Sequence, residues 1–355
     1  MYLLLHCVLT FWAPAAALPE HVLLSDTTVD AGVRRRVVEA AGDRLAEQYV
    51  FPDVAQRARA RLRTRLAQGA YDRLIHGDSF AAALTADLQA VTGDRHVGVL
   101  FDPVRRPAVE WEKPTPEALE RTRRAQAFSN FAFKKVERLN GNIGYLRVDQ
   151  FLSPTVAGET LAAAMTFVAN TEALIIDLRY NPGGDPAAVA LMASYLVPPV
   201  PAQLTGVVAR DGTETQSWTL PFVQGARFAG REVFVLTSAR TGSAAEAFAY
   251  DLQALGRARV VGERSAGAAN PGGTVRVDER FMVFVPTGRA VNPVTRSNWE
   301  GRGVTPDIPV SAEAAQQTAY VAALRAVLER DPSGPQVELI RAALESAERA
   351  VPARP

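Results

Sequence analysis

A serine at position 243 combines a potentially nucleophilic side chain with the start of an expected helix. The apolar run 233–236 predicts a buried strand, and the turn that follows it contains Thr241 and Gly242. A side chain at such a strand-to-helix switch lies outside the carboxyl end of a strand, where α/β folds place their active sites. The first amide of the helix, that of Ala244, can stabilise an oxyanion beside a nucleophile. The pattern therefore indicates acyl transfer with Ser243 as the nucleophile.

The same residues have a purely structural interpretation. Ser243 and Glu246 have the Ser-x-x-Glu spacing of a capping box, in which the two side chains satisfy free backbone amides at a helix start. A capping box explains both residues without any catalysis, so the spacing alone leaves the two interpretations open.

A second loop fits the other half of an oxyanion hole. The apolar strand that ends near Asp177 is followed by Leu-Arg-Tyr-Asn-Pro and the pair Gly183-Gly184. Paired glycines let the backbone approach a substrate closely and direct an amide at it. A plain turn after a strand is the alternative interpretation of this pair.

A serine hydroxyl needs a base near neutral pH, and the composition leaves few candidates. The last lysine of the chain is Lys135, so no lysine follows the serine. Of the four histidines, His6 lies in an expected signal segment, His21 beside its cleavage site, and His76 in a polar stretch between helices. His96 remains, at the point where a helical pattern gives way to a strand pattern.

The base in turn needs an orienting carboxylate. Glu300, in a glycine-rich loop before the last core strand, and the nearer Asp94 are both candidates, and sequence order does not choose between them. A solvated loop carboxylate is the structural alternative for Glu300.

The N-terminal residues predict export. A mostly apolar stretch, 3–12, precedes three alanines at 15–17, which is the pattern of a cleaved signal peptide of residues 1–17. Its removal takes away Cys7, the only cysteine, and so excludes a thiol enzyme and cysteine metal sites. A formal net charge of +1 gives no global attraction to nucleic acid, and no later segment is long and apolar enough to span a membrane. We expect a periplasmic or secreted protein without cofactor, metal, nucleic-acid partner or stable membrane span.

Strand and helix patterns alternate through the centre of the chain, which predicts an α/β core with substantial parallel pairing. Expected strands are 142–148, 173–179, 232–237, 259–262 and 280–286, and expected helices are 157–168, 186–196 and 243–255. The predicted domains are an N-terminal helical domain at 18–100, a connecting segment at 101–127, the α/β core at 128–311, and C-terminal helices at 312–355. An exposed C-terminal helix pair could mediate a homo-oligomer.

Four segments, taken in order, resemble the carboxyl-terminal-processing (tail-specific) serine peptidases. They are Gly93-Asp-Arg-His, Gly144-Tyr-Leu-Arg with Asp177-Leu-Arg-Tyr-Asn-Pro-Gly-Gly, Thr237-Ser-Ala-Arg-Thr-Gly-Ser-Ala-Ala-Glu, and Glu300-Gly-Arg-Gly-Val-Thr-Pro-Asp. Ala268 stands where members with a Ser–Lys dyad carry the lysine. The helical segment from Leu45 is similar to the branch that includes interphotoreceptor retinoid-binding protein and the tricorn core.

The resemblance implies a crotonase/ClpP-like α/β spiral behind an N-terminal helical bundle. It also implies Ser243 as nucleophile, His96 as base, Glu300 as the acidic member, and an oxyanion hole formed by Ala244 and Gly184 with Gly183. Two departures are Arg95, where tricorn-type sites carry a serine before the base, and the absence of a recognisable PDZ domain.

Together these features predict an exported serine peptidase that acts on peptides or unfolded proteins, with Asp94 and Glu246 as supporting residues. The alternative is a non-catalytic carrier of apolar ligands or peptides on the same scaffold.

Overall fold

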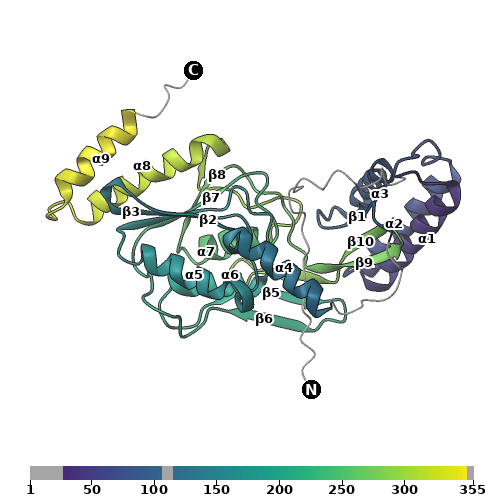
Figure 1. Cartoon of the computed structure of the whole chain (residues 1–355), viewed down its shortest axis with the longest axis horizontal. Helices are drawn as coiled ribbons and strands as arrows, with labels where there is room; N and C mark the ends of the chain where they lie inside the picture. Colours follow the sequence, from purple (N-terminus) through teal and green to yellow (C-terminus); the bar gives the residue numbers. More distant parts are fainter. Residues whose placement is uncertain (1–26, 106–114, 350–355) are drawn as a thin grey trace. The chain divides into compact units, whose positions relative to one another are not determined.

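The computed structural model describes residues 27–105 and 115–349 (Figure 1). The predicted signal peptide and Cys7 lie outside these ranges. Contacts divide the chain into two compact units. Unit 1 comprises residues 1–114, 207–215 and 268–291, and unit 2 comprises 115–206, 216–267 and 292–355. The chain therefore passes between the units several times.

Three helices and an antiparallel sheet form unit 1. The helices are α1 (Ala31–Gln48), α2 (Pro52–Ala67) and α3 (Gly77–Thr92), and the sheet has the order β1-β10-β9. Its strands are β1 (Gly98–Phe101), β9 (Gly272–Asp278) and β10 (Phe281–Pro286), and β11 (Gly288–Val291) follows them. The apolar positions that recur every three or four residues along the helices pack with β10 into one core, which contains Leu45, Leu62, Leu84 and Phe281.

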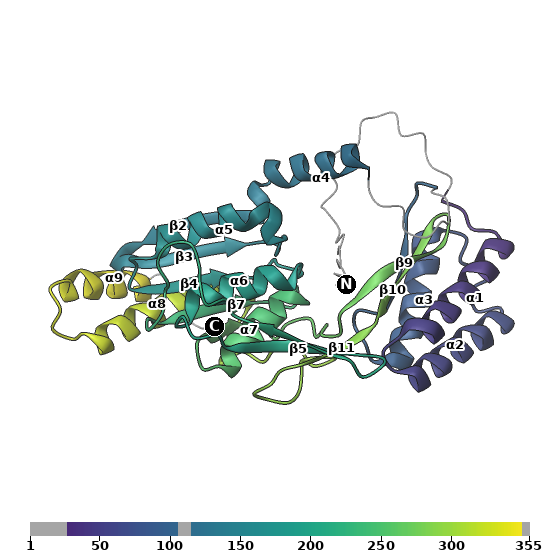
Figure 2. The same cartoon turned by 90° about the horizontal axis from the view of Figure 1, so that it is seen from below.

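A six-stranded sheet forms the centre of unit 2, in the order β12-β8-β7-β4-β3-β2. Its strands are β2 (Phe133–Leu139), β3 (Ile143–Val148), β4 (Ala173–Asp177), β7 (Val233–Thr237), β8 (Arg259–Gly262) and β12 (Ile308–Pro309). Only β2 pairs antiparallel, and the other neighbours are parallel. Figure 2 shows β2, β3 and β4 side by side.

Helices cover both faces of this sheet. The pair α8 (Ala312–Arg330) and α9 (Val337–Arg349) packs on one face, through a core that includes Ile175, Phe234 and Leu324. The helices α5 (Pro154–Val168) and α6 (Pro186–Leu196) lie on the other face (Figure 1). The helix α7 (Ala244–Ala254) contacts α6 and β8. Strands β4 and β7 are buried at every position, as expected for central parallel strands.

The strand register brings two loops together. Asp177 at the end of β4 pairs with Leu236 near the end of β7, so both strands end at the same edge of the sheet. The loops that follow them, which contain Gly183 and Ser243, therefore start side by side. This is the edge at which parallel α/β sheets bind their ligands.

The predicted fold class is confirmed: an α/β core with a parallel sheet lies between N-terminal and C-terminal helices. The segments 207–215 and 268–291, which the sequence placed in the core, group with unit 1. The expected connecting segment contains a helix, α4 (Pro116–Phe128). The strands β5 (Gln203–Ala209) and β6 (Glu214–Trp218) are each divided between the units. Across the described residues, no helix combines the length and the apolar character that crossing a membrane requires.

Candidate active site

The turn that carries Ser243 is held by the loop after β4. The hydroxyl of Thr241 donates to the Leu178 carbonyl at 2.8 Å. The Gly242 amide donates to the carbonyl of Asn181 at 3.1 Å. These two bonds tie the nucleophile turn to the glycine loop before α7 begins.

Ser243 itself has an unusual backbone. Its φ and ψ are 51° and −120°, a region that residues other than glycine rarely occupy. It forms the predicted capping box with Glu246. Capping does not require this conformation, because Asp30 and Ser311 cap α1 and α8 with φ of −78° and −63°. Strain of this kind collects at functional sites, so the backbone favours the catalytic interpretation over capping alone.

The glycine loop passes so close to Ser243 that side chains are excluded from it. Gly183 and Gly184 have φ of 124° and 139°. A Cβ on Gly183 would lie 2.7 Å from the Ser243 Cβ, and one on Gly184 would lie 1.9 Å from the carbonyl oxygen of Phe151. Both positions therefore require glycine, which a plain surface turn does not.

Two backbone amides at this point have no acceptor. The Gly183 amide donates to Asn181 Oδ1 at 2.8 Å, so it is already used. Within residues 27–105 and 115–349, neither the Gly184 amide nor the Ala244 amide has a hydrogen-bond acceptor. Ala244 is the first residue of α7, where the helix dipole favours negative charge. Gly184 and Ala244 are thus the two donors available for an oxyanion.

Asn181 organises this loop, and the sequence analysis did not identify it. The side chain is completely buried and also donates from Nδ2 to the Val148 carbonyl at 3.1 Å. An asparagine two residues before a glycine is typical of a turn in which the side chain accepts the backbone amide. That spacing was the signal available in the sequence.

Glu246 is a buried carboxylate that connects two segments. It is completely buried and accepts the Ser243 amide at 2.8 Å. Its other oxygen accepts the Ser265 hydroxyl and the Gly267 amide, both at 2.6 Å. Glu246 therefore fixes the nucleophile turn to the loop 265–267.

The same network reaches the loop that carries Glu300. The Ser265 hydroxyl accepts the Val304 amide at 2.6 Å. Within the loop, the Glu300 amide donates to Asn298 Oδ1 at 2.9 Å, and the neighbouring Trp299 is buried. Ser265 thus links the Glu300 loop to Glu246 and, through it, to the turn of the nucleophile.

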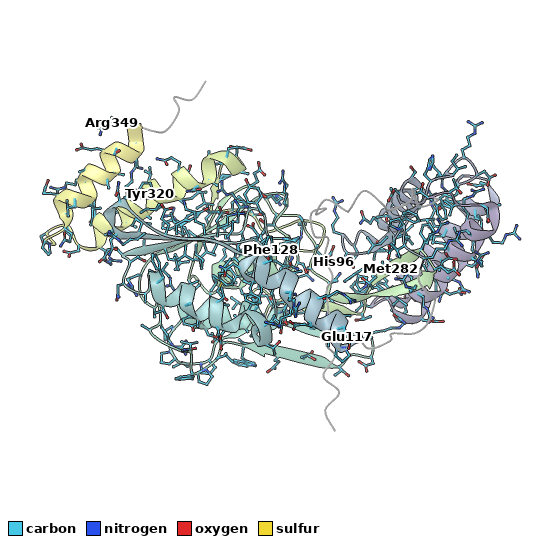
Figure 3. All side chains as sticks on the ribbon, viewed as in Figure 1. His96, Glu117, Phe128, Met282, Tyr320 and Arg349 are labelled. Atoms are coloured by element: carbon cyan, nitrogen blue, oxygen red, sulfur yellow. The ribbon has the colours of Figure 1, made fainter. Side chains whose placement is uncertain are left out.

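His96 lies in unit 1, between the end of α3 and β1 (Figure 3). Its ring stacks on Phe284 of β10, with 5.4 Å between the ring centroids. Burial lowers the pKa of His96 below its ordinary 6.5, while the charge of Asp94 and a hydrogen bond to the Asn270 backbone act in the opposite direction. The Nδ1 atom is buried and has no hydrogen-bond partner among the described residues. The imidazole is therefore kept largely neutral, as a general base requires.

Asp94 holds the backbone around His96. Its Oδ1 accepts the His96 amide at 3.0 Å, and its Oδ2 accepts the Tyr49 hydroxyl at 3.1 Å and Asn270 Nδ2 at 2.9 Å. Three donors thus occupy this carboxylate, and none of them is the imidazole ring.

The predicted site residues fall into two groups. Unit 2 brings together the nucleophile turn, the glycine loop and their support, namely Ser243, Ala244, Glu246, Gly183 and Gly184, and its network includes the loop of Glu300. Unit 1 brings together His96 and Asp94. That His96 and Asp94 join Ser243 in one active site stays a prediction.

Two family models match this chain over most of its length. The model of peptidase family S41 matches residues 142–310. The model of the N-terminal domain of this family in eukaryotic IRBP matches residues 31–134. The chain belongs to peptidase family S41.

Solved structures with the same fold support this assignment at the level of architecture. A lipoprotein from Streptococcus agalactiae is 14% identical with a TM-score of 0.52, and the match covers 88% of this chain and 99% of that one. A putative peptidase from Parabacteroides merdae is 18% identical with a TM-score of 0.50, over 78% and 90% of the two chains. The tricorn protease is 13% identical with a TM-score of 0.50, over 89% of this chain and 37% of its own.

Proposed function

We propose that this S41 family member is a serine peptidase that uses Ser243 as nucleophile, His96 as general base and Glu300 as the orienting carboxylate. The observation that carries the proposal is the strained Ser243 at the start of α7, beside the free amides of Gly184 and Ala244. Membership of a peptidase family and a site geometry suited to acyl transfer both support hydrolysis of peptide bonds.

The reaction begins when unit 1 brings the His96 imidazole to the Ser243 hydroxyl. The neutral imidazole removes the hydroxyl proton as Ser243 Oγ attacks the peptide carbonyl, and a tetrahedral oxyanion forms. His96 then returns the proton to the leaving amine, and the acyl group remains on Ser243. Water, activated by the same imidazole, hydrolyses the acyl-enzyme and restores the serine.

The amides of Gly184 and Ala244 donate hydrogen bonds to the oxyanion and so stabilise its developing negative charge. Donors of this kind act on charge that exists only in the transition state, and the loss of one typically costs about 3–4 kcal/mol. Because the glycine loop holds the Gly184 amide and the backbone of Ser243 holds the Ala244 amide, both are oriented before the substrate binds.

The most direct test is labelling with a fluorophosphonate probe, which reacts only with an activated serine. Wild type should be labelled, and Ser243→Ala and His96→Ala should not. Ser311→Ala is a matched control, because Ser311 also stands at a helix start but has ordinary backbone angles. Labelling that survives in Ser243→Ala would refute the nucleophile, and an unlabelled wild type that retains bound lipid or peptide would instead indicate a carrier.

The substrate class follows from the family: peptides or unfolded proteins. Degradation of unfolded casein by wild type, and its absence with Ser243→Ala, tests this substrate class. We also propose export to the periplasm or the medium, which rests on the N-terminal apolar pattern. Recovery of the full-length chain in the cytoplasm of its native cell, with the first 17 residues uncleaved, would contradict export.

A further inference from the structure

The helix that begins beside the nucleophile also carries a second buried carboxylate. Asp251 lies one and a half turns beyond Glu246 on α7 and is 2% exposed. No cation pairs with it among the described residues. All three of its hydrogen bonds reach the same oxygen, Oδ1, from the Thr205 amide at 3.0 Å, the Thr205 hydroxyl at 2.6 Å and Asn292 Nδ2 at 2.8 Å.

The residues that Asp251 holds stand at the points where the chain leaves and re-enters unit 2. Thr205 precedes the passage into unit 1 between residues 206 and 207. Asn292 is the first residue of unit 2 after the return from unit 1. Asp251 therefore anchors two connecting segments that are 87 positions apart in sequence.

Glu246 anchors the segment at a third point where the chain crosses between the units. It accepts the amide of Gly267, which is the last residue of unit 2 before the chain crosses again into unit 1. The two carboxylates of α7 thus hold three of the segments that connect the units, and the helix that holds them begins next to Ser243.

We infer that α7 is the anchor through which the base-bearing unit is attached to the nucleophile, with Asp251 as a positioning residue for catalysis. The carboxylate contacts no reacting atom. It fixes the ends of the segments that carry unit 1, and so limits the positions that His96 can take relative to Ser243. The inference rests on the proposed function, since it concerns the same two residues.

The chemistry of Asp251 fits such a role. Burial raises its pKa to about 6, against which the bonds from Thr205 and Asn292 act. Burying a carboxylate without a cation is costly, and the three hydrogen bonds offset part of that cost. Three donors from two distant segments can converge on one carboxylate oxygen, whereas an apolar side chain would leave them without an acceptor.

The test measures the placement of the units and the chemistry separately. Spin labels at Arg57→Cys on α2 and Glu329→Cys on α8, in a Cys7→Ser background, report the distance between the units by double electron–electron resonance. Both positions are exposed, and neither forms an ion pair within residues 27–105 and 115–349. Asp251→Ala should broaden the distance distribution and lower kcat about 10- to 100-fold, with KM nearly unchanged, because a shift of about 1 Å at the reacting groups has an effect of this size.

Two variants separate positioning from general destabilisation. Asp251→Asn keeps an acceptor oxygen and should restore a narrow distribution and most of kcat. Asp87→Ala removes a buried carboxylate of similar connectivity that lies wholly within unit 1, where Tyr71, Arg61 and Arg65 bond to it. It should lower stability without broadening the distribution or changing kcat.

If Asp251→Ala does not fold, Thr205→Val replaces one hydroxyl by a methyl and should give a smaller broadening in the same direction. A distribution in Asp251→Ala as narrow as in wild type would overturn the inference, whether or not kcat falls. The distance measurement requires no catalysis. An inactive wild type whose units loosen in Asp251→Ala would defeat the proposed function and leave the anchoring role in place.

Discussion

The nucleophile side of the proposed site, around Ser243, is fixed by hydrogen bonds within unit 2. The base side, around His96, is fixed less completely within unit 1. Around Ser243, every segment is tied to another: Thr241 to Leu178, Glu246 to Ser265, and Asn181 to Gly183. Around His96, Asp94 holds the backbone and the ring has one hydrogen bond, to the Asn270 backbone, but its Nδ1 atom is buried without a partner in the described part of the chain. The difference indicates that the nucleophile is preorganised locally, whereas the base depends on a partner for its orientation.

The largest expected effect tests which carboxylate supplies that partner. We expect Glu300→Gln to lower kcat by up to about 10⁴-fold, because a base in the wrong tautomer loses about this much. We expect Asp94→Asn to lower kcat by less than about tenfold, because its remaining oxygen can still accept the His96 amide. Steady-state kinetics of the two variants side by side decide the matter. A greater loss in Asp94→Asn would show that the base side is complete within unit 1.

Substitution of Gly183 should disrupt the preorganised backbone around Ser243. A methyl group there would lie 2.7 Å from the Ser243 Cβ and 3.0 Å from the Ala244 amide nitrogen. Gly183→Ala should therefore displace the oxyanion donors and lower kcat about 10²–10³-fold, the loss typical of one such donor.

Gly256→Ala is the control for this substitution. Gly256 follows α7 with φ of 63°, and an added Cβ meets nothing within 4 Å. It should cost stability, about 1 kcal/mol, with kcat unchanged. Equal kcat losses in both variants would mean that backbone strain in general, rather than the shape of the glycine loop, limits activity.

The pH dependence of kcat/KM tests the role of His96 on the base side. The imidazole acts as a base only when neutral, so kcat/KM should fall about tenfold per pH unit below the pKa of His96. Burial lowers that pKa, which places the midpoint below pH 6.5. Because the charge of Asp94 raises the pKa of His96, Asp94→Asn should move the midpoint to still lower pH. A kcat/KM profile without any fall on the acid side of pH 6.5, down to the pH at which the protein unfolds, would exclude His96 as the base.

The two sides also differ in how far the sequence predicted them. The strands β4 and β7, the helix α7 and the serine between them follow from local apolar patterns and one turn, and they were predicted within a few residues. The turn that Asn181 makes with the Gly183 amide is local and was overlooked, whereas its bonds to Val148 and Gly242 could not be predicted, because these residues come from distant segments of the chain.

The set of segments that makes up unit 1 could not be predicted from local sequence patterns, for a related reason. The strand β1 pairs with β10, which is about 180 residues later in the chain, and α3 contacts β1 and places Phe80 against Phe281 of β10. No periodicity within either segment records that pairing. His96 was predicted as the base by eliminating the other histidines and the lysines and by the family resemblance, and neither argument describes the surroundings of the residue.

The last comparison sets a buried carboxylate of unit 2, Asp251, against one of unit 1, Asp87, by the pH dependence of the free energy of unfolding. Burial raises the pKa of Asp251 to about 6, above its unfolded value of about 3.8. Between these values the folded state binds more protons, so the free energy of unfolding should fall as pH rises from about 4 to 6, by about 3 kcal/mol. Asp251→Asn removes this dependence, and the difference between variant and wild type should grow over the same pH interval.

Asp87 of unit 1 should show the opposite sign. Its burial raises the pKa, but the bonds from Tyr71, Arg65 and Arg61 outweigh it, and the pKa is lowered below 3.8. The folded state then binds fewer protons than the unfolded one, so Asp87 stabilises the fold above pH 4 and loses this contribution as the pH falls. Urea unfolding of Asp251→Asn and Asp87→Asn from pH 3.5 to 7 measures both slopes. Parallel slopes would contradict the raised pKa of Asp251, whereas the anchoring role of α7 rests on the hydrogen bonds of Asp251 and Glu246 and is tested by the distance measurement.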